Sequence, residues 1–87
     1  MMIQKISAPV SVNLIFDHQT RQAFPKYVSW EGQVYQINKI GLHHTYRTGK
    51  TLIHVFSVES STLFFRLVLN TDTLHWTLEE ISDGESD

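Results

Sequence analysis

The sequence predicts an all-β protein of about six antiparallel strands, folded as a small barrel or a strongly bent sheet. Three observations lead to this class. Apolar residues alternate with other residues in successive short segments, which is the periodicity of a strand. Clusters of turn-forming residues separate these segments. No convincing amphipathic helix pattern interrupts the strand pattern in 87 residues.

The clearest pattern is a C-terminal three-stranded meander from Leu52 to Leu78. Residues 59–62 and 70–73 are predicted to form four-residue hairpin loops, so that Phe56 faces Phe65 and Leu67 faces Trp76. One face then receives every second residue of the three strands. These inward positions are Leu52, His54, Phe56 and Val58, then Leu63, Phe65, Leu67 and Leu69, then Leu74, Trp76 and Leu78.

Three further strands are predicted upstream. The first follows Pro9 and alternates at Val10, Val12, Leu14 and Phe16. The next two, 26–30 and 33–40, form a hairpin around Glu31-Gly32, because glycine supplies the positive φ of a tight turn. This hairpin pairs Trp30 with Gln33 and Val28 with Tyr35. A change of apolar phase near residues 38–39 predicts a β-bulge, and residues 41–50 are predicted to be a connection.

The domain organisation is simple. Residues 9–81 are predicted to form a single β domain, residues 1–8 a loosely ordered segment and residues 82–87 a disordered acidic tail. Residues 1–78 carry seven basic residues against four acidic ones, a net charge of +3. The chain has no cysteine, which excludes disulfides and thiolate metal sites and fits a cytoplasmic location. No apolar run reaches the roughly 18 residues of a membrane span, so no membrane association is expected.

The pattern of polar residues does not favour an enzyme. No serine nucleophile elbow is present, and Thr48-Gly49-Lys50-Thr51 lacks the upstream glycine of a phosphate-binding loop. The five histidines lack the spacing of a metal site, so neither a metal nor another cofactor is expected. His54 falls on the inward face, where we expect it to be hydrogen-bonded to a neighbour.

Two surface features are candidates for function. The first is the outer face of the meander, where the predicted register brings apolar side chains together beside an arginine. Such a patch is typical of a site that binds a protein partner or a second copy, unless the N-terminal segment or a second core layer covers it. We expect a homodimer with Phe64 near its centre. The residues of this predicted partner-binding site are Ile53, Val55, Phe64, Arg66 and Val68.

The second feature gives the alternative function, weak nucleic-acid binding through a hairpin at residues 39–50. Cationic groups interleaved with an aromatic ring suit phosphate contacts and base stacking. A charge of +3 is small for a nucleic-acid-binding domain, so we favour an ordinary solvated hairpin tip for these residues. Among the functions, nucleic-acid binding ranks second, behind binding of a protein partner. The residues concerned are Lys39, His43, His44, Tyr46, Arg47 and Lys50.

Three short segments also carry a family resemblance. They are Pro9-Val10-Ser11-Val12, the hairpin from Tyr27 to Ile37 with Trp30, Gly32 and Tyr35, and Trp76-Thr77-Leu78. Together they resemble a group of small, uncharacterised bacterial all-β domains that share an aromatic-x-Trp-x-Gly-x-x-Tyr hairpin. The resemblance implies a β fold and a bacterial origin. It implies no activity, because the group has none agreed.

Overall fold

The structure, a computed structural model, describes residues 3–83 as seven antiparallel strands with no helix in that range. They form one sheet in the order β3-β2-β1-β7-β6-β5-β4. The predicted all-β class is therefore confirmed, with one strand more than about six. The strands are β1 (Ile3–Asp17), β2 (Gln22–Trp30), β3 (Gln33–Gln36), β4 (Lys39–Thr48), β5 (Thr51–Ser60), β6 (Leu63–Asn70) and β7 (His75–Ser82). Residues 3–83 include no helix able to span a membrane.

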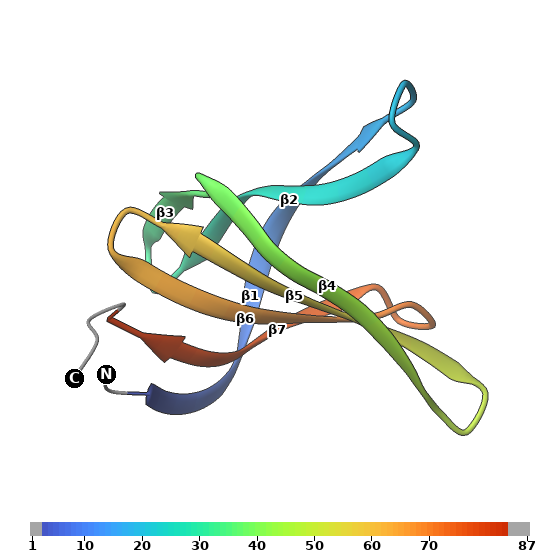
Figure 1. Cartoon of the computed structure of the whole chain (residues 1–87). Helices are drawn as coiled ribbons and strands as arrows, with labels where there is room; N and C mark the ends of the chain where they lie inside the picture. Colours follow the sequence, from blue (N-terminus) through green and yellow to red (C-terminus); the bar gives the residue numbers. More distant parts are fainter. Residues whose placement is uncertain (1–2, 84–87) are drawn as a thin grey trace.

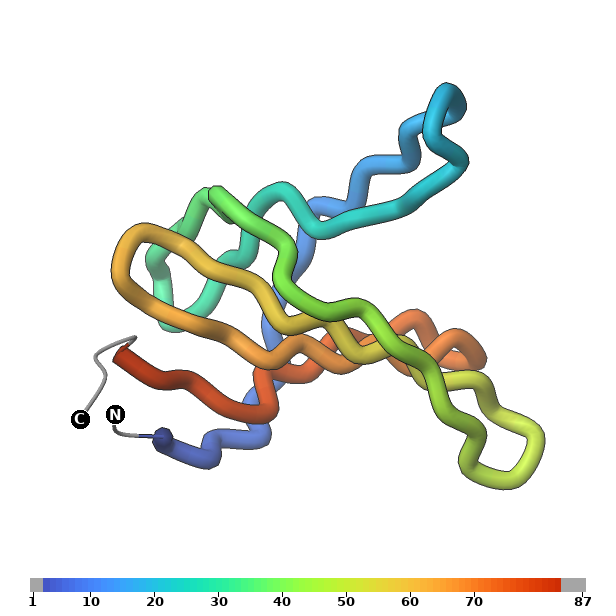
Figure 2. Tube along the Cα trace, in the orientation of Figure 1, coloured from blue at the N-terminus to red at the C-terminus, as the bar shows by residue number. Residues whose placement is uncertain are grey.

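The sheet curls into a half-barrel, as Figure 1 and Figure 2 show. β3 and β4 follow one another in the sequence but lie at opposite edges of the sheet. Their connection is bonded to strands from both halves. The N–H of Ile37 donates to the carbonyl of Lys26 in β2 (2.9 Å), and the N–H of Asn38 donates to the carbonyl of Glu59 in β5 (2.8 Å). The connection thus holds the two ends of the sheet together at this point.

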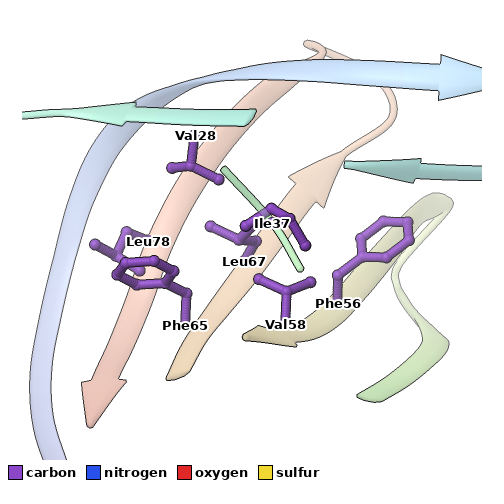
Figure 3. Close-up of a cluster of buried hydrophobic side chains, with 7 residues drawn as sticks. All are labelled: Val28, Ile37, Phe56, Val58, Phe65, Leu67 and Leu78. Carbon is purple, nitrogen blue, oxygen red and sulfur yellow. The ribbon is translucent and has the colours of Figure 1, made fainter. Parts of the chain in front are cut away.

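The concave side of the sheet holds the core. Its seven buried side chains point into the curl from β2, β5, β6, β7 and the β3–β4 connection (Figure 3). Trp30 and Trp76 are partly buried and pack against this cluster. Removing these apolar groups from water provides the main driving force for the curl. The cluster consists of Val28, Ile37, Phe56, Val58, Phe65, Leu67 and Leu78.

The β2–β3 hairpin forms as predicted. Trp30 pairs with Gln33 and Val28 pairs with Tyr35. Glu31 and Gly32 form the turn, with φ angles of 52° and 79°. The predicted bulge lies slightly later than expected, because the register of β4 against β5 shifts between Ile40 and Leu42. The chain also breaks at residues 37–38, so the predicted strand 33–40 is divided between β3 and β4.

The register predicted for the meander is wrong by two residues in both strand pairs, β5 with β6 and β6 with β7. Ser60 pairs with Leu63 across a two-residue loop, so Phe56 faces Leu67 instead of Phe65. Leu67 in turn faces Leu78 instead of Trp76. The tight loop requires a positive φ at Ser61, 56°, and the sequence gives no glycine to signal it. A slip of two residues preserves the faces, because side chains alternate with a period of two.

Leu74 was predicted to point inward, and this prediction is also wrong. Leu74 lies in the β6–β7 turn with a φ of 62° and is 70% exposed. Asn70 organises this turn. Its side-chain oxygen accepts hydrogen bonds from the N–H groups of Asp72 (2.9 Å) and Thr73 (3.2 Å). The loop therefore consists of residues 71–74, as long as the predicted 70–73 but one position later, and β7 starts only at His75.

Two segments predicted to lack regular structure are strands. Residues 3–8 belong to β1, and Ile3 and Gln4 pair with Ser82 and Ile81 of β7. Most of the predicted 41–50 connection belongs to β4, which pairs with β5 along its length. The apolar alternation is missing from β4 because it is an edge strand, exposed on both faces. Ser82, assigned to the predicted disordered tail, ends β7, and residues 84–87 lie outside the described range.

The hairpin of β1 and β2 extends away from the rest of the sheet, as both views of the chain show (Figures 1 and 2). The strand predicted from Val10 to Phe16 is confirmed and continues at both ends. At its far end Leu14, Ile15 and Phe16 are exposed, Phe16 by 65%. Along β1 the apolar residues thus change from packing against the core at Val12 to lying in solvent at Phe16.

Leu67 and Leu74 provide a direct test of the corrected inward face. Leu67→Ala should lower the free energy of unfolding by about 2–5 kcal/mol, because Leu67 is fully buried and its loss leaves a cavity. Leu74→Ala removes the same atoms from an exposed turn and should change stability by less than about 0.5 kcal/mol. Urea denaturation followed by tryptophan fluorescence measures both. Equal losses in the two variants would contradict the assigned face.

Candidate protein-binding surface

Phe64 lies at the centre of a row of residues that crosses the outer, convex face of the sheet. Its ring is 41% exposed, although it sits on the interior strand β6. Neighbours of Phe64 on the adjacent strands follow from the register. The row, from β4 across to β1, consists of Lys39, Glu59, Phe64, Ser82 and Ile3. Because side chains alternate, this face is opposite to the core residues Val58 and Phe65.

A hollow of about 370 Å³ lies on this face, at the lower end of the range for binding sites. Its second wall is the next row of paired residues, Ser57, Arg66 and Glu80. Gly41 contributes to the lining at the bulge in β4. A Cβ atom at Gly41 would lie 3.2 Å from the backbone oxygen of Ser57, so glycine allows β4 to approach β5 closely here. We call this feature the Phe64 hollow.

Charges of both signs surround the aromatic ring. Arg66 Nε lies 3.0 Å from Glu79 Oε1, with side chains 41% and 42% exposed. The N–H is not aligned for a hydrogen bond with that carboxylate. An ion pair this exposed contributes little to stability because water screens it. Arg66 can therefore exchange Glu79 for another carboxylate at low cost, and arginine beside an aromatic residue is typical of protein interfaces.

The structure brings together only part of the predicted partner-binding site. Phe64 and Arg66 line the hollow, whereas Ile53 and Val55 are buried, with 7% and 1% of their surface exposed. Val68 is half-buried and pairs with Val55. The two-residue slip is the reason, since it moves Phe64 away from Val55 and places it beside Glu59. The N-terminal strand borders the hollow through Ile3 and leaves Phe64 exposed.

Several lining residues were missed because the hairpin loop was assigned two residues too long. Glu59 pairs with Phe64, and Ser57 with Arg66, only in the actual register. Lys39 joins the row beside Glu59 because most of the predicted 41–50 connection belongs to β4, which pairs with β5. Glu80 joins them because β7 has a bulge between Leu78 and Glu80. No local pattern marks the tight turn, which is supported by Asn38, 23 residues away, whose side-chain oxygen accepts the N–H of Ser61 (2.7 Å).

The predicted nucleic-acid-binding residues do not share one face. Strand alternation places His44 and Tyr46 on the outer side of β4, and His43 and Arg47 on the inner side. Lys39 belongs to the Phe64 hollow, and Lys50 lies in the β4–β5 turn. Lys39, His44 and Tyr46 therefore share the outer face, whereas His43 and Arg47 lie on the inner face.

His43 and His54 form the second notable group, on the inner side of β4 and β5. His43 Nε2 lies 2.7 Å from His54 Nδ1, a hydrogen bond that confirms the expectation for His54. The ring centroids are 5.0 Å apart and the planes differ by 27°, so the rings meet nearly edge to edge. His43 also stacks on Phe56, with centroids 4.1 Å apart. Such a bond needs one nitrogen with a proton and one without.

Protonation of His43 is disfavoured by its surroundings. Partial burial lowers the pKa of His43 below the ordinary value of 6.5, and the charges of His54 and His44 lower it further. No third ligand accompanies the pair, because residues 3–83 contain no group of three or more His, Cys, Asp or Glu arranged to hold a metal ion.

Comparison of the chain with protein-family models, curated proteins and solved structures finds no match. The resemblance of the Tyr27–Ile37 hairpin to small bacterial β domains thus stays a prediction.

The His43–His54 pair predicts how stability depends on pH. The pKa of His43 is lower in the folded chain than in the unfolded chain, so the unfolded chain binds its proton more readily. Stability from this contact is complete above pH 6.5 and is lost as the pH falls through the lowered pKa. The melting temperature should therefore fall as the pH is lowered from 7.5 to 5. His43→Gln should make the melting temperature less dependent on pH over this range.

His18→Gln is the matched control, because His18 lies in the β1–β2 connection, away from this pair. It should leave the pH dependence of the wild-type protein unchanged. An equal flattening in both variants would contradict the role assigned to His43.

Proposed function

We propose that this domain is a non-enzymatic interaction module that binds a second copy of itself through the Phe64 hollow. The observation that carries the proposal is the exposed aromatic ring of Phe64 in a hollow on the outer face of a curled sheet. Burying an exposed phenylalanine against a partner is favourable, with about 1.5–3 kcal/mol as the limit for a fully exposed side chain. The hollow also provides cations and carboxylates for a polar rim.

The charges of the hollow support a second copy as the partner. Two copies related by a two-fold axis present the same surface to each other, so that surface must complement itself. Lys39 and Arg66 provide positive charge, and Glu59 and Glu80 provide negative charge, around the same ring. A rotation about Phe64 can place each cation of one copy near a carboxylate of the other. A strongly acidic or basic partner would leave half of these charges opposed.

The lining favours binding over catalysis. Ser57 and Ser82 provide hydroxyl groups, but no histidine is among the lining residues to activate them. The histidine pair of β4 and β5 lies on the opposite, inner face of the sheet. A bacterial origin and a cytoplasmic location belong to the same proposal, supported by the family resemblance and by the absence of cysteine.

Phe64→Glu tests the proposal. Sedimentation velocity over a range of concentrations should show the wild-type protein as a dimer that dissociates on dilution. Phe64→Glu should give a folded monomer at every concentration, because two carboxylates would meet at the centre of the interface.

Val34→Glu is the matched control, because Val34 is exposed on β3 at the other end of the sheet. This variant should dimerise like the wild type. A wild-type protein that stays monomeric at high concentration, or a Phe64→Glu variant that still dimerises, would overturn the proposal.

A further inference from the structure

β4 is an open edge of the sheet. It comes last in the strand order and pairs only with β5. Nine of its ten residues are exposed, and only Ile40 is partly buried. In Figure 1 β4 runs along the outside of the sheet and continues into the projecting β4–β5 turn. The free side of an edge strand presents unpaired N–H and C=O groups, which a further strand can bind.

The β4 edge has a uniform charge. Lys39, Arg47 and Lys50 lie in the strand and its turn, and no acidic residue occurs from position 39 to position 58. Lys39 pairs with Glu59 on the adjacent strand β5. Arg47 and Lys50 form no ion pair with any residue in the range 3–83. Both cations are exposed and available to a partner.

The two faces of the edge also differ in character. Leu42 and Tyr46 point to the outer side, which they share with Lys39 and His44, and are 67% and 47% exposed. Arg47 and His43 point to the inner side. An added strand would place alternate residues beside each group, since directly opposite residues share a face. Apolar residues suit the outer positions beside Leu42 and Tyr46, and acidic residues suit the inner positions beside Arg47.

We propose that β4 binds an extended acidic segment of a partner protein, which adds to the sheet as a further strand. Main-chain hydrogen bonds along β4 provide affinity, and the side chains on the two faces select the sequence. The preferred segment alternates apolar residues with aspartate or glutamate. This site lies at the sheet edge; it shares Lys39 and Gly41 with the Phe64 hollow but does not use Phe64.

Other occupants fit less well. A second copy of β4, paired antiparallel, would bring Lys39 of one copy toward Arg47 and Lys50 of the other, and this approach of like charges is unfavourable. A nucleic acid needs cations and aromatic rings on one surface, whereas Arg47 and Tyr46 lie on opposite faces. Strand addition uses the edge itself, where both faces are reached by alternate residues.

A synthetic peptide of alternating valine and glutamate, with the same ten-residue length as β4, tests the proposal by fluorescence anisotropy. This peptide should bind, and its valine–lysine counterpart should not. Arg47→Glu should weaken binding by about fivefold or more, since an attractive contact becomes repulsive. Arg21→Glu is the control, because it makes the same change of charge in the β1–β2 turn and should bind like the wild type.

Backbone methylation distinguishes strand addition from simple charge attraction. Two further peptides carry N-methyl groups either on all valines or on all glutamates, which blocks one edge of the peptide each. One of the two should lose binding, and the other should keep it. The proposal would be overturned if the two N-methylated peptides bound equally well, or if the unmethylated peptide did not bind. Tighter binding of a single-stranded oligonucleotide than of the peptide would also overturn it. Phe64→Glu should bind the peptide normally, so the two proposals can fail separately.

Discussion

The hydrogen bonds between the β3–β4 connection and the β5–β6 turn are the constraint on which the fold depends. Ser60 Oγ donates to the carbonyl of Gln36 (2.6 Å), and the N–H of Ser61 donates to the side-chain oxygen of Asn38 (2.7 Å). The N–H of Asn38 donates back to the carbonyl of Glu59 (2.8 Å). These bonds join opposite ends of the curled sheet. They also hold Ser61 in the positive φ that a two-residue loop requires.

Both candidate surfaces follow from this junction. The tight loop sets the register of β5 against β6, which places Phe64 between Glu59 and Ser82 and opens the hollow on the outer face. The junction also directs the chain from Asn38 into β4 along the outside of β5. Curling buries the inner face of the sheet but leaves β4 without a partner on its free side. A sheet that closed completely would have no such edge.

Patterns with a local physical cause were predictable from the sequence, and those that depend on distant contacts were not. Alternation predicted the all-β class and the inward positions of Phe56 and Leu67, and Gly32 predicted the β2–β3 turn. The tight turn at Ser61 has no local signal, because its positive φ is supported by Asn38, which is 23 residues away. Phe64 and Arg66 were placed correctly on the outer face, but Ile53 and Val55 were not recognised as buried.

Amide NMR at increasing protein concentration shows whether two copies associate through the outer face at Phe64. Signals of Phe64, Arg66 and Ser57 should shift as copies associate, while those of β3 stay constant. Shifts confined to the exposed end of the β1–β2 hairpin at Leu14–Phe16, or spectra that do not change with concentration, would contradict this prediction.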